Sequence, residues 1–375
     1  MAKAVYVGVG SKARKMKKAY VGIGGKARKV KKMYIGVGGK ARLCYSAELE
    51  KVGMAENLSD ERRTVAASVG NYALFAGGIG HGSFIDRAHD AVDAYSASLT
   101  KSMPTALSTV RYRHAGASVE GYALFAGGAD GQRTVDIVDS VDAYSASLTR
   151  TAAATLSGER VWMGAASLEG RAFFAGGASS NMNSDNKCAN VEVYNSTLTR
   201  TAATNLSVAR YYPLTATIGS RVLFAGGTGN TITKVVDVYS TSLTRTAAAD
   251  LSRPTSGDAS TVVGNYAIFT SDGNTSCDVY NASLTKTTVT LLSVARVNMS
   301  AGTVGDYALF AGGGTNSPYS DVVDACDTSL TRTTVTTLDY PRSGLSSATV
   351  GDYLLFAGGR IDSENYSSDV FVYTA

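Results

Sequence analysis

The sequence is short of proline, histidine, tryptophan and charged residues, and these shortages exclude several classes of protein. Its 375 residues include 5 Pro and 40 Gly, 44% are hydrophobic, and 18% are charged, against roughly 25% in ordinary soluble domains. This composition excludes a disordered chain and a coiled coil. No segment reaches the roughly 18 consecutive apolar residues of a membrane helix, and the first residues lack the apolar core of a signal peptide. We therefore expect a chain that is made and folded in a cytoplasm, without a membrane span.

Residues that bind metals or perform catalysis are few and scattered. The four cysteines lie far apart without a CxxC spacing, so neither a zinc site nor a disulfide framework is indicated. His81 and His89 share one segment with Asp86 and Asp90, which makes a weak surface metal site conceivable, although a solvated loop is the simpler interpretation. There is no GxSxG, no HExxH and no distinct paired-carboxylate motif. We expect no cofactor, no metal and no catalytic residue.

Positive charge is concentrated at the N-terminus. Residues 1–42 hold 13 of the 36 Lys and Arg and none of the 31 Asp and Glu, so the remainder carries 23 basic and 31 acidic side chains, a net charge of −8. A basic arm joined to an acidic body indicates two parts with different partners. We place the arm at residues 1–42 and the body at residues 43–375.

The arm contains three copies of one 14-residue unit, in which a Tyr-led apolar run meets a glycine turn and then a Lys-Ala-Arg segment. Each copy predicts a β-hairpin, and the three together predict a small β-meander. The arm has too few large apolar residues for its own core, which favours docking to another protein or self-association. A solvated basic tail and a nucleic-acid-binding arm are alternatives. The predicted docking residues are Tyr6, Tyr20, Tyr34, Arg14, Arg28 and Arg42.

From residue 44 onward a longer unit recurs seven times. Runs such as NYALFAGG and DYLLFAGG mark it, and their Phe residues lie 41 to 50 residues apart. This period, with four strand signals in each unit, is typical of a β-propeller, so we predict seven blades. The repeat phenylalanines are Phe75, Phe125, Phe174, Phe224, Phe269, Phe310 and Phe356.

The two ends of the chain complement each other in this scheme. The last unit stops near Tyr373 and lacks its outermost strand, while CYSAELEKV near the start matches the segment that forms this strand in other units. We expect Glu48 to Val52 to pair with the strand that ends at Tyr373, which would close the ring and remove its free edges. The predicted fold is an all-β, seven-bladed propeller that is closed by an N-terminal outer strand and preceded by a basic hairpin arm.

Sequence variation falls on one face of the predicted propeller. Antiparallel strands place the first-to-second and third-to-fourth turns on one face, where the turns are short and alike. The other connections lie on the opposite face, and their lengths differ from unit to unit. Because loops on a rigid scaffold carry recognition, we predict that this variable face binds the ligand.

The three residues that begin 13 positions before each repeat Phe, here named the lead-in triplets, also differ between units. Aromatic residues and arginines gather in the triplets of units one to four, which also have long loops. Such side chains suit a sugar or a peptide surface, although Trp162 and Tyr212 equally suit a plug for the channel mouth. The candidate ligand-binding residues are Arg62, Tyr112, Arg113, His114, Asp130, Arg133, Trp162, Asn183, Asp185, Tyr211, Tyr212 and Asn298.

An arginine precedes the triplet in five units. A residue kept in most copies of a ring is expected to be structural, holding neighbouring backbone carbonyls through its guanidinium donors. These arginines are Arg111, Arg160, Arg210, Arg296 and Arg342.

Residues 44–375 resemble the kelch-repeat family, in which a strand ending in a diglycine precedes an acidic-aromatic strand, as in FAGG and VDAY here. The match is divergent, because unit five has Ser271-Asp272 in place of the diglycine and Leu stands where kelch repeats carry a Trp. With its tandem YVGIGGKARKVKK arm, the chain resembles kelch-like proteins of prophages and phage tail clusters. The resemblance implies a virion or tail component. Residues 1–42 would anchor it to a tail or baseplate protein or to itself, and the propeller would bind a host surface glycan or protein.

Some kelch propellers are enzymes, so other functions stay open. Copper radical oxidases resembling galactose oxidase need two His and two Tyr around the metal, whereas the histidines here are confined to units one and two, as His81, His89 and His114. The alternatives to a binding protein are a sugar-modifying enzyme and an intracellular scaffold that binds protein or nucleic acid.

Overall fold

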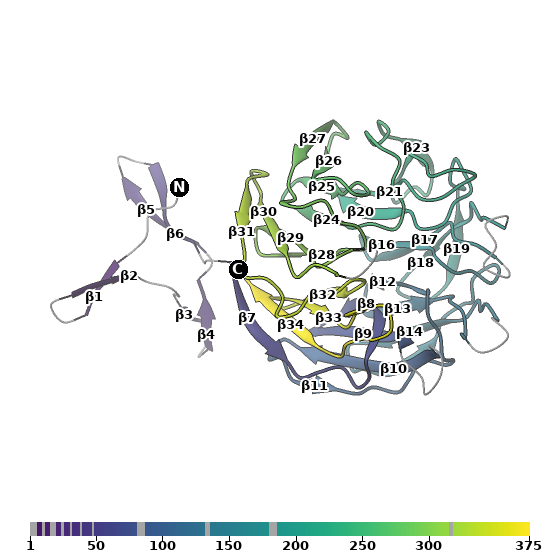
Figure 1. The fold of residues 1–375 in the computed structure, drawn as a ribbon, viewed down its shortest axis with the longest axis horizontal. Coiled ribbons are helices and arrows are strands. Elements are labelled where there is room, and N and C mark those ends of the chain that lie inside the picture. Colours follow the sequence, from purple (N-terminus) through teal and green to yellow (C-terminus); the bar gives the residue numbers. More distant parts are fainter. Residues whose placement is uncertain are drawn as a thin grey trace.

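The computed structural model describes residues 6–9, 12–15, 20–23, 26–30, 32–37, 40–46, 49–80, 87–131, 136–179, 186–314 and 318–375. These residues form strands and connections, and seven four-stranded antiparallel sheets stand radially around one axis (Figure 1). The protein is therefore a seven-bladed β-propeller, as predicted. The described residues include no helix long and apolar enough to cross a membrane.

Each blade follows the chain from its innermost to its outermost strand. Blade one contains β8 (Arg62–Val69), β9 (Tyr72–Gly80), β10 (Arg87–Ser96) and β11 (Lys101–Ser102). Blade two contains β12 (Ala115–Val119), β13 (Tyr122–Ala126), β14 (Val141–Ser145) and β15 (Arg150–Ala152). Blade three contains β16 (Gly164–Leu168), β17 (Arg171–Ala175), β18 (Val191–Tyr194) and β19 (Arg200–Ala203).

The next three blades repeat this order. Blade four contains β20 (Leu214–Ile218), β21 (Arg221–Ala225), β22 (Val236–Tyr239) and β23 (Arg245–Ala247). Blade five contains β24 (Ser260–Val263), β25 (Tyr266–Phe269), β26 (Ser276–Asn281) and β27 (Lys286–Thr290). Blade six contains β28 (Ser300–Val304), β29 (Tyr307–Ala311), β30 (Val323–Asp327) and β31 (Arg332–Thr334).

Blade seven joins the two ends of the ring. Its first three strands are β32 (Ser346–Val350), β33 (Tyr353–Ala357) and β34 (Val370–Thr374), and its outermost strand is β7 (Glu50–Ala55) from the N-terminal side of the ring. The predicted closure is confirmed, with β7 two to three residues later than expected. Thr374 pairs with Glu50 and Val370 pairs with Ala55 across an antiparallel ladder that contains one bulge.

The repeat phenylalanines form the core between neighbouring blades. All seven are fully buried. In six blades the ring meets the Tyr of the third strand edge-on, with ring centroids 5.7 to 6.0 Å apart, a favourable aromatic geometry. Blade six has the buried Cys326 at this tyrosine position. Six blades therefore pack a similar aromatic pair into the core, which explains why the repeat is so regular in sequence.

The arginines before the lead-in triplets are structural, as predicted. Each is buried, and its guanidinium pairs with a carboxylate near the third strand of the same blade. The N···O distance is 2.9 Å between Arg210 and Asp237. Arg62, which was predicted to belong to the ligand site, makes the same kind of pair in blade one, with Asp93 at 2.7 Å. The other pairs are Arg111–Asp142, Arg160–Glu192, Arg296–Asp324 and Arg342–Asp369.

Blade five has no arginine at this position, and its buried third-strand carboxylate has other partners. Thr255 takes the arginine position and donates from its hydroxyl to Asp272 at 2.9 Å. Asp278, the third-strand acid, accepts instead from the Ser252 backbone N–H at 2.7 Å and from the Thr288 hydroxyl at 2.9 Å. The buried carboxylate is thus satisfied in every case, as its desolvation requires.

The basic arm forms three hairpins. They are β1 (Tyr6–Val9) with β2 (Lys12–Lys15), β3 (Tyr20–Ile23) with β4 (Lys26–Lys29), and β5 (Lys32–Val37) with β6 (Lys40–Ser46). The predicted hairpins are confirmed, but among the described residues each strand pairs only within its own repeat, so the expected continuous meander is not formed. An isolated hairpin has no second layer of structure against which it could bury apolar side chains. The repeat therefore supplies no packing energy that would join the three hairpins into one sheet.

The point where the arm joins the ring follows from the register of β7. Val370 follows the long β33–β34 loop, so Val370 and its partner Ala55 lie at the variable face. Glu50, at the other end of β7, pairs with Thr374 and therefore lies at the opposite face. The chain thus enters the ring from the face that carries the short, uniform turns.

Candidate functional site: the mouth of the central channel

Outside blade one, the lead-in triplets hold their middle residues in an unusual backbone conformation. The φ angle is 58° at Arg113, 60° at Trp162, 53° at Tyr212 and 55° at Asn298. Left-handed backbone costs a non-glycine residue about 1 kcal/mol or more, and such strain is concentrated at functional sites. Blades five and seven have glycine at this position, Gly257 and Gly344, with φ of 69° and 66°.

Backbone hydrogen bonds between blades fix this conformation around the channel. The Trp162 N–H donates to the Arg113 carbonyl at 3.0 Å, and the Tyr212 N–H donates to the Trp162 carbonyl at 2.9 Å. The Gly344 N–H donates to the Asn298 carbonyl at 3.1 Å. Neighbouring blades thereby lock one another, and the middle side chains of blades two, three and four are held at the channel mouth.

These side chains line a hollow of about 340 Å³ at the channel mouth. Five of the predicted ligand residues contribute to its wall: Tyr112, Arg113, His114, Trp162 and Tyr212. Arg63 from blade one and Arg360 and Tyr366 from blade seven complete the polar part of the wall.

Aromatic rings form one side of this hollow. The Trp162 ring lies 5.2 Å from Tyr211 and 5.3 Å from Tyr212, measured between centroids. The Arg113 guanidinium lies 4.7 Å from the ring centroids of both Tyr112 and Trp162, within cation–π range. Tyr212 keeps 39% of its surface exposed. The cluster is thus both ordered and open to a ligand.

Arginines form the other side. The Arg63 side chain reaches solvent through the mouth, and its guanidinium lies so close to Gly344 that a Cβ there would collide with it. Enclosure by the mouth lowers the pKa of Arg63, and the nearby charges of Arg360 and Arg113 lower it further, while Tyr212 and Tyr366 act in the opposite direction. The mouth therefore carries positive charge in a concave, partly dry setting.

His114 contributes an uncharged side chain to the wall of the hollow. Its ring is buried and lies edge-on to Phe125 at 6.0 Å. Burial, together with the charge of Arg111, lowers the pKa of His114 to about 3. The imidazole is therefore uncharged at neutral pH and adds no positive charge to the mouth.

The structure moves one predicted residue out of the site. Arg62 is fully buried in its ion pair with Asp93 and belongs to the structural arginines, while Arg63 takes the place at the channel. The reason is a register shift in β8 between Arg63 and Val65, which displaces blade one by one residue relative to the other repeats.

The remaining predicted residues have varied positions. Tyr211 lies behind Trp162, and Asn298 shares the strained lead-in position but does not line the hollow. Asp130 accepts a hydrogen bond from the Asp136 backbone N–H at 3.1 Å. Arg133, Asn183 and Asp185 lie outside the described residues. Of the docking residues, Tyr6, Tyr20 and Tyr34 fall on the first strands of the hairpins, and Arg14, Arg28 and Arg42 fall on the second strands.

The described histidines and cysteines do not belong to a metal-binding cluster. The part of the chain that the structure describes contains no group of three His, Cys, Asp or Glu side chains that could hold a metal ion. His89 is buried, with its Nδ1 3.5 Å from Asp60, whereas His81 and Asp86 lie outside the described residues. Cys188, Cys277 and Cys326 are free thiols.

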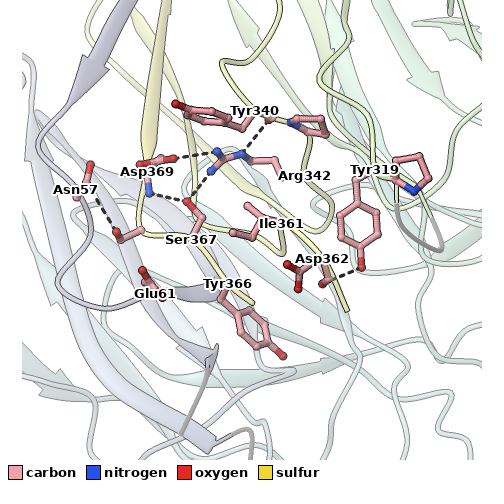
Figure 2. Close-up of a pocket in the computed structure, with 13 residues that line it drawn as sticks. Asn57, Glu61, Tyr319, Tyr340, Arg342, Ile361, Asp362, Tyr366, Ser367 and Asp369 are labelled. Carbon is pink, nitrogen blue, oxygen red and sulfur yellow. Dashed lines mark hydrogen bonds and ion pairs between the residues drawn. The ribbon is translucent and has the colours of Figure 1, made fainter. Parts of the chain in front are cut away.

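A second hollow on the variable face was not predicted from the sequence. It measures about 560 Å³ and lies between blades six and seven, against the chain that links β7 to β8 (Figure 2). Tyr319, Tyr340 and Ile361 form an apolar wall, with Tyr340 63% exposed, and Asn57, Glu61 and Asp362 supply polar groups. Tyr366 lines both hollows, so this second hollow, here named the groove, adjoins the channel mouth.

Arg342 connects several residues in the wall of the groove by hydrogen bonds. Figure 2 shows the Arg342 guanidinium beside Ser367 and Asp369, to which it donates at 2.7 and 2.9 Å, and it also donates to the Tyr340 carbonyl at 3.3 Å. Tyr319 donates from its hydroxyl to the Asp362 carbonyl at 3.3 Å. Arg342 thus supports the floor from within, and the aromatic side chains remain available for stacking.

Asp258, in the lead-in triplet of blade five, makes stability depend on pH. Burial raises its pKa from 3.8 to about 7. Because the folded state holds this proton more tightly than the unfolded state, the contribution is full below about pH 4 and is lost as pH rises through 7. We expect wild type to lose on the order of 2 kcal/mol relative to Asp258→Asn between pH 5 and pH 8. Denaturant unfolding at both pH values checks this, and equal pH dependence in the two proteins would contradict it.

Comparisons with known proteins support the fold. No protein-family model and no curated protein sequence matches the chain. Among solved structures, that of YjhT aligns with 86% of this chain and 97% of its own length, with a TM-score of 0.55 and 13% sequence identity. At this identity the similarity shows the propeller fold alone.

Proposed function

We propose that this protein is a non-enzymatic binding component of a phage or phage-like tail, with kelch-like ancestry, which recognises a host surface glycan or protein through the variable face. The observation that carries the proposal is the channel mouth, where Trp162, Tyr212 and Arg113 are held in place by strained, hydrogen-bonded backbone. Rigid aromatic faces beside directional donors are the combination that sugars and peptide surfaces need.

The position of the arm supports the same proposal. The chain enters the ring at the face opposite the channel mouth, so a body anchored through residues 1–42 would present its variable face outward. In this proposal the arm docks on a tail or baseplate protein or on other copies of itself. Its excess of Lys and Arg also suits nucleic acid, which is the alternative partner for the arm.

Binding is favoured over turnover by the chemistry of the mouth. The described residues that line it include no Asp or Glu, and His114 is neutral because its pKa is about 3. General acid–base catalysis on a sugar needs groups that exchange protons near neutral pH. The wall supplies stacking surface and positive charge instead, which suit recognition.

The proposal predicts that Trp162→Gly strongly weakens binding without unfolding the protein. Glycine already occupies this position in blades five and seven, so the backbone accepts it and the hydrogen bond to the Arg113 carbonyl stays. Loss of a central aromatic anchor is expected to weaken binding about thirtyfold or more. A glycan array and a host-cell binding assay measure this, with thermal melting as the check on folding.

Asn298→Gly is the matched control for this experiment. It makes the same backbone change in blade six, at a residue that does not line the hollow, and it is expected to bind and melt like the wild type. Unchanged binding by Trp162→Gly, or equal losses in both variants, would count against the channel mouth as the binding site.

A further inference from the structure

We infer that the channel mouth binds an acidic saccharide, and that Arg63 recognises its carboxylate or phosphate group. The inference rests on the proposed function and names the chemical class of its ligand. It is carried by the position of Arg63, which lines the channel mouth and, among the described residues, has no carboxylate within ion-pair distance.

Arginine side chains gather at the mouth. Arg63, Arg113 and Arg360 line one hollow of about 340 Å³, and no Asp or Glu is among the described residues that line it. Burial lowers the pKa of the Arg63 guanidinium, and the nearby charges of Arg360 and Arg113 lower it further. The charged form of the enclosed Arg63 guanidinium is stabilised when an anion enters the hollow.

Arg63 contrasts with the six structural arginines. Each of those is buried and has its own carboxylate, as with Arg62 and Asp93 one residue away in the chain. Among the described residues no carboxylate lies within ion-pair distance of Arg63, although its guanidinium is held in place against Gly344. Its donors face the hollow, where they suit the paired oxygens of a carboxylate or phosphate.

The neighbouring rings indicate that the anion belongs to a sugar. Trp162 and Tyr212 line the same hollow as Arg63, so a ring stacked on them would bring an acidic substituent to the guanidinium. The volume is near the lower limit for small-ligand pockets, which suits one sugar unit better than a protein surface. The adjoining groove beyond Tyr366, with Tyr319 and Tyr340, provides room for further units of a polymer.

Calorimetric titration of the full-length protein tests the inference with matched probes. The carboxylate probe is trigalacturonate, and its trimethyl ester is the neutral control of the same shape. The phosphate probe is mannose 6-phosphate, with mannose as its control. A hexa-aspartate peptide tests for recognition of acidic peptide. We expect one acidic sugar to bind at least about tenfold more tightly than its neutral counterpart, and the probe that does so identifies the source of the anion.

Arg63→Gln should remove this preference while leaving the fold intact, because the side chain reaches solvent and has no structural ion pair. Arg253→Gln, an exposed arginine on the same face that does not line the hollow, should behave like the wild type. Arg63→Lys should restore part of the affinity, because it restores the charge without the planar fork.

Three results would overturn the inference. They are equal binding of acidic and neutral sugars, an acidic preference that survives in Arg63→Gln, and tighter binding of hexa-aspartate than of either sugar. If cells or neutral glycans bind in a manner that depends on Trp162 but not on Arg63, the proposed function stands and this inference fails. If an acidic sugar binds through Arg63 but host surfaces do not bind, the inference stands and the tail function fails.

Discussion

Deletion of residues 43–55 is expected to destroy the cooperative unfolding transition of the propeller, whereas deletion of residues 1–40 leaves it in place. Deletion of residues 43–55 removes β7, the outermost strand of blade seven, and exposes the backbone edge of β34. It also removes Lys51, whose Nζ lies 2.5 Å from Asp339 and 5.0 Å from the Phe371 ring centroid. An open ring has two free edges, and free edges promote aggregation.

Differential scanning calorimetry with size-exclusion chromatography measures this difference. The protein without residues 43–55 should show a broad or absent transition and elute as aggregate, while the protein without residues 1–40 should melt within a few degrees of the full-length chain. Light scattering of the latter in low and high salt also reports on the arm, because loss of a defined oligomer would identify residues 1–40 as the assembly element. Equal melting of both truncations would show that closure by β7 is dispensable.

The seven blades could be predicted from the sequence because the residues that build them recur at equivalent positions in the repeats. All seven blades bury the same Phe and six of them pair the same arginine with an acid, so the repeats report one structure several times over. The exceptions come from local irregularities. The register shift between β8 and β9 displaces the blade-one residues by one position relative to the other repeats. An alignment of the repeats by their Phe residues therefore places Arg62 in the ligand site that Arg63 occupies.

The site was predictable only where repeats could be aligned. The strained middle position was signalled by Gly257 and Gly344, since glycine in two copies indicates a positive φ at the aligned position, but Arg113 and Trp162 give no such hint themselves. The groove of Tyr319, Tyr340 and Ile361 has no repeat position, because its residues come from three separate connections that only the folded ring brings together. Arg360, on the loop of the last blade, was missed for the same reason.

Asp237→Ala is expected to destabilise the propeller by about 3 to 5 kcal/mol, because it leaves the guanidinium of Arg210 buried without its counter-ion. Asp237 is fully buried between Arg210 at 2.9 Å and Arg245 at 3.1 Å, and it also accepts from the Ser207 backbone N–H at 3.0 Å. Urea unfolding measures the loss of free energy. Arg245→Ala removes the half-buried partner of the same carboxylate and should cost about 1 kcal/mol or less.

The double variant Arg210→Met with Asp237→Leu separates the charge from the shape of this pair. Replacing both partners leaves no unpaired buried charge, so most of the loss in Asp237→Ala should be recovered. Blade five offers a natural precedent, since Thr255 stands at the arginine position there and the blade keeps its four strands. If the double variant is as unstable as Asp237→Ala, the pair stabilises the blade through its directional hydrogen bonds to the backbone, such as that from Arg210 to the Phe224 carbonyl at 3.0 Å, and not through charge neutralisation.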